Sequence, residues 1–154
     1  MDETRQQDIV WVRFPFSNMQ DSKFRPALVL SHDSYNKNSL DIVACSITSK
    51  LGKKEFSVLI DDSNLSRGKM TLKSNIRADK VSSIEKDMIV KSFARLNDET
   101  YDLVVDEIDR LIKRSVPEKT AKEFVNDFTD VPKLKKPLTA KKIKKTTEEQ
   151  YELR

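Results

Sequence analysis

Hydrophobic runs occupy the first two-thirds of the chain, and short polar stretches separate them. Short runs that are rich in β-branched and aromatic residues predict β-strands. The predicted strands are residues 8–14, 26–31, 40–47, 56–60 and 89–93, and residues 70–74 and 76–81 supply one or two more. Several short strands at this spacing are typical of a closed or partly closed barrel.

A helical periodicity follows the last predicted strand. Apolar residues at helical spacing form one stripe, and its members are Leu103, Val104, Ile108, Leu111 and Ile112. Asp98 is the predicted N-cap. The pattern therefore predicts a helix over residues 98–114 that packs on the barrel, and one short helical turn is expected within 82–88. The fold class is mainly β (α+β).

The composition changes after Arg114, where three prolines interrupt the chain and apolar residues become scarce. Residues 119–128 and 139–153 have some helical character, but they carry too little apolar surface to be stable alone. Residues 133–145 contain seven lysines and no acidic residue, so the net charge of +4 is concentrated there. We expect a barrel with its closing helix over 1–114 and a charged, partly helical or flexible appendage over 115–154.

The composition also limits the classes of function. Cys45 is the single cysteine and lies in an apolar run, which argues against disulfides and a cysteine-based zinc site. The N-terminus lacks a basic start followed by an apolar stretch, so no signal peptide is expected. No apolar run approaches the roughly 18 residues of a membrane span. A cytoplasmic location is expected.

Polar residues stand where several predicted strands begin or end. Arg25 precedes one strand, Thr48 ends another, and Arg77 and Asp79 interrupt a third. A guanidinium, a hydroxyl and a carboxylate that converge at strand ends are suited to a phosphate group, because arginine binds phosphate oxygens with two parallel hydrogen bonds. The same pattern also has non-functional explanations. Arg25 fits a surface ion pair, Thr48 has high strand propensity, and Arg77 and Asp79 share a strand face and can pair with each other.

RNA cleavage through the ribose 2′-hydroxyl needs a base, a cation near the phosphate and an acid for the leaving oxygen. His32 is the only histidine, so a paired-histidine mechanism is excluded. No close group of carboxylates with ligand spacing occurs, which argues against a two-metal nuclease. No metal or other cofactor is therefore expected. Trp11 is interpreted as a core or interface residue.

Three segments in order along the chain carry a family resemblance. They are residues 8–16 (DIVWVRFPF) with 25–31 (RPALVLS), residues 41–49 (DIVACSITS) and residues 74–86 (SNIRADKVSSIEK). Over about residues 7–113 the sequence resembles the MazF/PemK family of toxin–antitoxin ribonucleases, in particular its PemK-like branch.

The resemblance implies a small SH3-like β-barrel of the PemK/CcdB type, usually a homodimer. It implies a toxin endoribonuclease (an mRNA interferase) that cuts single-stranded RNA without a metal and leaves a 2′,3′-cyclic phosphate and a 5′-hydroxyl. A cognate antitoxin is the implied protein partner. The alternative is a non-catalytic binding module on the same barrel, which inhibits a protein target or acts as a regulatory RNA-binding protein.

The resemblance also assigns residues. It implies that Arg25 contacts the phosphate and transfers a proton, and that Thr48 positions the phosphate. Asp79 is the candidate base for the 2′-hydroxyl, and Arg77 the candidate acid or charge stabiliser. Further RNA contacts are expected from Gln20, Lys23, Ser49, Ser74 and Lys80.

Two departures from the family pattern stand out. Gln7 occupies the position before the first strand where the family usually has glycine, which affects the turn more than the chemistry. The polar segment 17–24 replaces a loop that usually contains glycine. Because that loop commonly controls RNA entry and contacts the antitoxin, the resemblance gives neither the cleavage motif nor the identity of the antitoxin.

Overall fold

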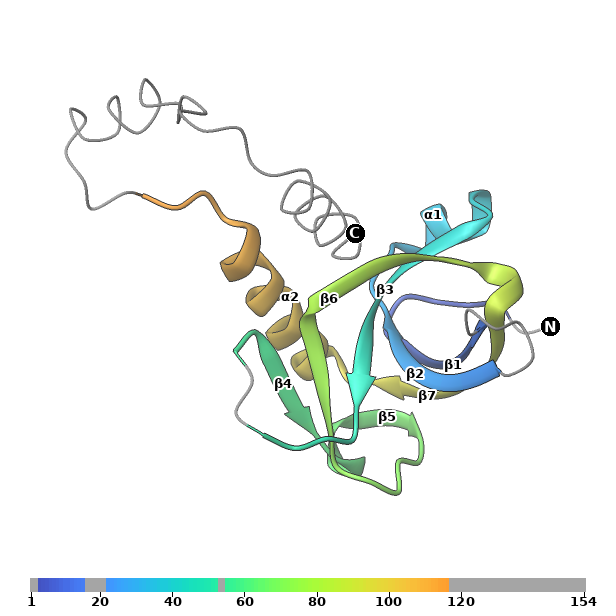
Figure 1. Cartoon of the computed structure of the whole chain (residues 1–154), viewed down its shortest axis with the longest axis horizontal. Coiled ribbons are helices and arrows are strands. Elements are labelled where there is room, and N and C mark those ends of the chain that lie inside the picture. Colours follow the sequence, from blue (N-terminus) through green and yellow to red (C-terminus); the bar gives the residue numbers. More distant parts are fainter. Residues whose placement is uncertain (1–2, 16–21, 53–54, 117–154) are drawn as a thin grey trace, which may run out of the picture. The chain divides into compact units, whose positions relative to one another are not determined.

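Seven antiparallel strands form one curled sheet, and a single long helix follows the last of them (Figure 1). The structure, a computed structural model, describes residues 3–15, 22–52 and 55–116. The strand order is β4-β6-β3-β2-β1-β7-β5. The strands are β1 (Asp8–Pro15), β2 (Ser22–Val29), β3 (Asp41–Thr48), β4 (Ser57–Ile60), β5 (Leu65–Gly68), β6 (Ser74–Glu85) and β7 (Ile89–Leu96), and the helical elements are α1 (Asp33–Asn38), η1 (Asp62–Asn64), η2 (Lys86–Met88) and α2 (Asp98–Ile112).

The curled, mainly β sheet with one C-terminal helix confirms the predicted fold class, and it is a half-barrel. Helix α2 covers the helix predicted over 98–114. It ends at Ile112, and its N-cap is Asn97 in place of Asp98: the Asn97 side chain accepts a hydrogen bond from the backbone N–H of Thr100 at 2.8 Å. The helical turn expected within 82–88 is η2. The appendage over 115–154 stays a prediction, because residues 117–154 lie outside the described residues.

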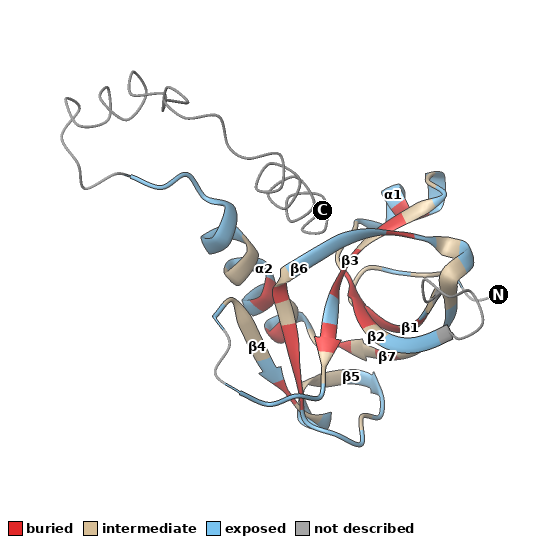
Figure 2. Cartoon of the chain, viewed as in Figure 1, coloured by how far each residue is buried: buried red, intermediate tan, exposed pale blue. Residues whose placement is uncertain are grey.

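Buried residues are red in Figure 2 and lie mainly on the strands. Alternation along the strands divides the core that they form into two clusters, one on each face of the sheet. Ile9 and Leu28 belong to the cluster that includes Val104 of α2, whereas their neighbours Val10 and Val29 belong to the other. All five are fully buried. Because side chains on a strand point alternately to opposite faces, a shift in register by one residue would expose both sets.

Cys45 lies in the cluster that α2 covers and is 1% exposed. Removal from water disfavours the charged thiolate, and this burial raises the pKa of Cys45 to about 12. The thiol therefore behaves as a small apolar core group, as its place in an apolar run predicted.

Strand β6 bends sharply where it crosses β3. Cys45 pairs with Val81 and Ile47 pairs with Ile76, so a step of two residues along β3 corresponds to a step of five residues along β6. The residues of β6 between these pairs leave the β3 ladder, and Arg77 pairs with Ser57 of β4 instead. Bulges of this kind redirect side chains. The sequence predicted one or two strands over 70–74 and 76–81; the structure has one, β6, which begins at Ser74 and runs through this bend, and residues 70–73 precede it.

Three described residues at strand boundaries adopt left-handed backbone: Gln7, Phe56 and Gly68. Gln7, which precedes β1, has φ of 75°. Its backbone N–H donates to Val29 O at 3.0 Å, and its carbonyl accepts from Leu96 N at 3.0 Å, so β2 and β7 both hold it in place. Gly68, the last residue of β5, has φ of 80°. Glycine at position 7 would adopt this conformation without a Cβ clash.

Candidate functional site

A pocket of about 680 Å³ lies where β2, β3 and β6 approach one another. Arg25 comes from β2, Thr48 from the end of β3 and Arg77 from the bend of β6. Lys69 follows β5 and contributes to the opposite part of the lining. The bend in β6 brings Arg77 to the pocket, because it removes that residue from the β3 ladder.

The lining of this pocket is basic. Six of its side chains are cationic and none of its described lining residues is acidic. The six are Lys23, Arg25, Lys50, Lys69, Arg77 and Lys80. Arg77 alone among the six forms an ion pair with a described residue, so the set keeps a net positive charge, which attracts polyanions and concentrates them in the pocket.

Three hydroxyl groups among the predicted residues also line the pocket. Thr48 Oγ1 accepts a hydrogen bond from the Lys50 backbone N–H at 3.2 Å, so its own hydrogen is available to a ligand. Ser49 is exposed beside it. Ser74 Oγ donates to Leu72 O at 3.1 Å, and the residue is 6% exposed. Thr48 and Ser49 are therefore better placed than Ser74 to donate a hydrogen bond to a ligand oxygen.

Arg77 and Asp79 form a bidentate ion pair. Nε of Arg77 donates to Oδ1 of Asp79 at 2.8 Å, and a terminal nitrogen donates to Oδ2 at 2.7 Å. The hydrogen bond from Arg77 is the main cause that lowers the pKa of Asp79, and the same bond raises the pKa of Arg77. The pair that the strand pattern allowed is thus present, and in this arrangement Asp79 is a weak base.

The structure brings most of the predicted site residues together. Seven line the pocket: Lys23, Arg25, Thr48, Ser49, Ser74, Arg77 and Lys80. Asp79 is absent from the lining and reaches the pocket only through its bond to Arg77. Gln20 lies outside the described residues. The Arg25 side chain makes no hydrogen bond or ion pair with any described residue, which leaves its guanidinium available to a ligand.

Two aromatic residues of the pocket were missed as site residues. Trp11 of β1 and Phe93 of β7 both line it, and their rings stack with centroids 5.0 Å apart and planes 24° apart. Trp11 was interpreted from sequence as a core or interface residue. The position of Trp11 on the strand face opposite to Val10 and Val12 was the available signal, because those valines alternate with it.

In the described part of the chain, no three His, Cys, Asp or Glu side chains lie close enough to hold a metal ion. The helices in that part are too short or too polar to cross a membrane.

The fold agrees with the comparisons with known proteins. The family model of the PemK-like, MazF-like toxin of type II toxin–antitoxin systems matches residues 5–112, and the chain belongs to this family. It is a MazF-like toxin of a toxin–antitoxin system. No curated protein matches the sequence.

Solved structures with the same fold include a MazE–MazF complex from Deinococcus radiodurans, which is 22% identical, with a TM-score of 0.62 over 73% of this chain and 99% of that chain. An endoribonuclease in complex with its cognate antitoxin from a mycobacterial species is 15% identical, with a TM-score of 0.60 over 74% and 99%. The Mycobacterium tuberculosis toxin MazF-mt6 is 15% identical, with a TM-score of 0.57 over 71% and 99%. At these identities the likeness concerns the fold.

Proposed function

We propose that this toxin is an endoribonuclease that cuts single-stranded RNA in the pocket of Arg25, Thr48 and Arg77. The observation that carries the proposal is the lining of that pocket, with six cationic side chains, no acidic one among the described residues and a stacked aromatic pair. Basic grooves with aromatic side chains bind single strands, since phosphates meet the cations and bases stack on the rings.

The proposed reaction uses a nucleophile that the substrate provides. The ribose 2′-oxygen attacks the adjacent phosphorus, and its proton passes to a base. The bond from phosphorus to the 5′-oxygen then breaks, and that oxygen takes a proton from an acid. The products are a 2′,3′-cyclic phosphate and a 5′-hydroxyl. Negative charge grows on the phosphoryl oxygens, so fixed cations stabilise the transition state more than the ground state.

The geometry supports distinct roles for the four residues. Arg25 has no described protein partner, so it contacts the phosphate and stabilises the developing charge. Thr48 donates its hydroxyl hydrogen to a phosphate oxygen. Arg77 is bound to Asp79 in this structure; when Arg77 turns to the phosphate, the Asp79 carboxylate is released and takes the 2′-proton. Lys23, Ser49, Ser74 and Lys80, with Gln20 from outside the described residues, complete the proposed RNA contacts.

The partners follow from the same proposal. The Deinococcus structure is of a MazE–MazF complex, and the mycobacterial endoribonuclease is in complex with its cognate antitoxin. We propose that a cognate antitoxin also binds this chain, that the toxin is a homodimer, and that it acts on mRNA in the cytoplasm.

Substitution of the two residues with the clearest roles tests the proposal. The double variant Arg25→Ala/Thr48→Ala should lose RNA cleavage while its thermal unfolding matches that of the native chain, because neither side chain packs in the core. Arg13→Ala is the matched control, because Arg13 is exposed on β1 and lines neither this pocket nor a second pocket beside β7. Full cleavage by the folded double variant would refute the assignment. RNA binding without cleavage by the native chain would instead support the non-catalytic alternative.

The assay should include EDTA. Activity that persists when divalent ions are removed agrees with a nucleophile from the substrate and cationic side chains as the only charge stabilisers. Loss of activity in EDTA, with recovery on addition of a divalent ion, would contradict the mechanism.

A further inference from the structure

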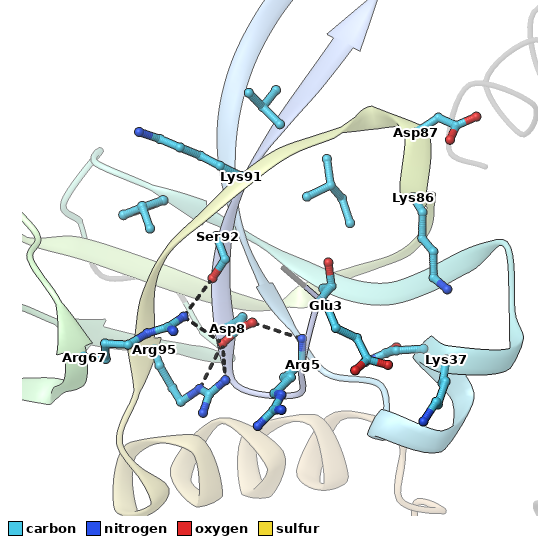
Figure 3. A pocket seen from close by; sticks show the side chains of 15 residues that line it. Glu3, Arg5, Asp8, Lys37, Arg67, Lys86, Asp87, Lys91, Ser92 and Arg95 are labelled. Carbon is cyan, nitrogen blue, oxygen red and sulfur yellow. Dashed lines mark hydrogen bonds and ion pairs between the residues drawn. The ribbon is translucent and has the colours of Figure 1, made fainter. Parts of the chain in front are cut away.

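A second and larger pocket, of about 990 Å³, opens between the N-terminal segment, β7 and η2 (Figure 3). Only Phe93 lines both this pocket and the pocket of Arg25. No role for it follows from the proposed RNA cleavage. In Figure 3, Arg67, Ser92 and Arg95 lie on one side of the space, and Lys37 and Lys86 lie on the other.

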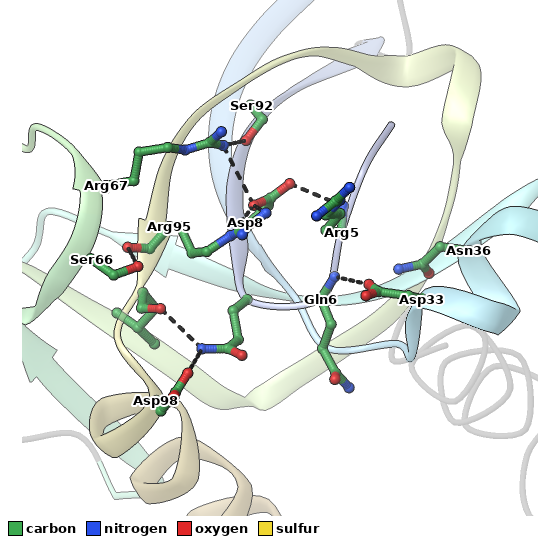
Figure 4. Close-up of polar contacts among 12 residues, drawn as sticks. Arg5, Gln6, Asp8, Asp33, Asn36, Ser66, Arg67, Ser92, Arg95 and Asp98 are labelled. Carbon is green, nitrogen blue, oxygen red and sulfur yellow. Dashed lines mark hydrogen bonds and ion pairs between the residues drawn. The ribbon is translucent and has the colours of Figure 1, made fainter. Parts of the chain in front are cut away.

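The base of the pocket is a fixed network around one buried carboxylate (Figure 4). The Asp8 side chain is 2% exposed. Its Oδ1 accepts from Nε of Arg95 at 2.9 Å, and its Oδ2 accepts from the backbone N–H of Arg5 at 3.0 Å. A terminal nitrogen of Arg67 lies 3.7 Å from Oδ1 and donates to Ser92 Oγ at 3.3 Å. The network links β1, β5 and β7 and holds two guanidinium groups at the pocket.

The cationic side chains exceed what this network neutralises. Six cationic side chains and three acidic ones line the pocket, which leaves three positive charges. The acidic residues are Glu3, Asp8 and Asp87, and Asp8 is already paired. The Arg67 side chain is 58% exposed, so most of its N–H donors remain accessible. The side chains of Arg5, Lys37, Lys86 and Lys91 make no hydrogen bond or ion pair with any described residue.

We propose that this pocket binds the phosphate group of a nucleotide, at a site separate from the pocket of Arg25. A phosphate monoester carries between one and two negative charges and three acceptor oxygens, which suits several separate cations better than a single carboxylate would. The Ser92 hydroxyl hydrogen is free to join them, since Ser92 Oγ accepts from Arg67. Ile89, Val90 and Phe93 supply an apolar part of the lining against which a sugar or base can pack.

The size of the pocket agrees with this class of ligand. Pockets for small molecules and cofactors hold about 300–1,000 Å³, and this one lies near the upper end. An isolated inorganic anion would leave most of that space to water. The phosphate can belong to a free mononucleotide or to an RNA strand, and the experiment below separates these two sources.

The test measures binding to the full chain by calorimetry and by amide chemical shifts, with adenosine 5′-monophosphate as the probe. The nucleotide should shift the amide signals of Ser92 and Arg95. Arg67→Ala and Lys91→Ala should each weaken binding about tenfold, the effect of losing one charge-assisted hydrogen bond. Asp8 keeps Arg95 and the Arg5 N–H in the Arg67 variant, so the fold is retained. Arg13→Ala is the matched control and should bind as the native chain does.

Further arms identify the site and the source. Arg25→Ala should leave the shifts of Ser92 and Arg95 unchanged; their loss would place the nucleotide in the other pocket and overturn the proposal. A short 2′-O-methyl oligonucleotide, which cannot be cleaved, should also bind more weakly to Arg67→Ala if the phosphate comes from RNA. An effect of Arg67→Ala on the mononucleotide alone would identify a free nucleotide, and it supports the proposal equally.

Three results would overturn the proposal. The first is that the nucleotide shows no saturable binding. The second is that the native chain, Arg67→Ala and Lys91→Ala bind the nucleotide equally well. The third is that a polyglutamate peptide binds more tightly than the nucleotide, which would assign the pocket to acidic peptides. None of these results depends on RNA cleavage. The proposed nuclease activity can therefore be refuted while the nucleotide site is retained, and the nucleotide site can be refuted while the nuclease activity is retained.

Discussion

The two glycines of the chain provide a controlled test of how β5 joins the sheet. Gly68 ends β5 and pairs with Ala94 of β7. A Cβ atom at position 68 would lie 2.2 Å from the carbonyl oxygen of Phe93 and 2.7 Å from the Cα atom of Ala94. Both contacts are with backbone, so no side-chain rotation relieves them. Gly52 is the control, because its ideal Cβ has no heavy atom within 4 Å.

The magnitude of the Gly68→Ala effect follows from two penalties. Left-handed backbone at φ of 80° costs an alanine about 1 kcal/mol. Displacement of the β7 backbone adds about 2 kcal/mol, in the range measured for overpacked sites. The free energy of unfolding should therefore fall by about 3 kcal/mol, which corresponds to a fall in Tm of about 10 °C for a domain of this size.

Circular dichroism melts of the two single variants provide the assay. Gly52→Ala should change the free energy of unfolding by about 0.5 kcal/mol or less. If the Tm of Gly68→Ala equals the Tm of the native chain and of Gly52→Ala, the pairing of Gly68 with β7 is wrong. A loss of stability with native-like RNA cleavage would show that β5 supports the fold without shaping the pocket that Lys69 lines.

Three other predictions follow from single residues. Gln7→Gly should be more stable than Gln7→Ala by about 1 kcal/mol in urea unfolding, since both variants lose the side-chain bonds and only glycine relieves the φ of 75°; equal stabilities would contradict it. Arg77→Gln should raise the pKa of Asp79, so the variant should be less stable than the native chain at pH 7. The difference in free energy of unfolding between the two should shrink as the pH falls through the carboxylate pKa; a difference that does not change with pH would contradict the prediction. Cys45 should resist alkylation at pH 8 in the folded chain and react after unfolding in urea, because burial raises its pKa to about 12; equal rates would contradict it.

The sequence predicted the elements that bury a regular apolar face. The alternation of Ile9 with Val10, and of Leu28 with its neighbours, is a local pattern that reports directly on the two sides of the sheet. Of the predicted stripe on α2, Val104 is buried and Ile108 packs against the core, whereas Leu103, Leu111 and Ile112 are exposed. These patterns were sufficient for the half-barrel and its closing helix.

Two elements depend on contacts that no local pattern reveals. Strand β5 carries only one partly buried apolar residue, Leu65, and its pairing with β7 decides its conformation. Helix α1 has no apolar stripe. Its start is capped by His32 Nδ1, which accepts from Ser34 N at 3.1 Å, and its buried Asn36 donates to Ser31 O at 2.9 Å. The sequence did not predict this capping role of His32.

The site shows the same division. Polar residues at strand ends were recognisable along the chain, and the structure gathers seven of those predicted around one pocket. The contributions of Lys69 and Phe93 were not recognisable, because they depend on which strands are neighbours and on the pairing of β7 with β1 and β5.

Cleavage of two matched oligonucleotides tests the central claim most directly. The first is RNA throughout, and the second differs only by a single 2′-deoxy sugar on the 5′ side of the bond that the native chain cuts. The account predicts that the first is cut, in EDTA, to a 2′,3′-cyclic phosphate and a 5′-hydroxyl, and that the second remains intact at that bond. Cleavage of the deoxy-substituted bond at a comparable rate would contradict it, because no 2′-oxygen would be present to attack the phosphorus.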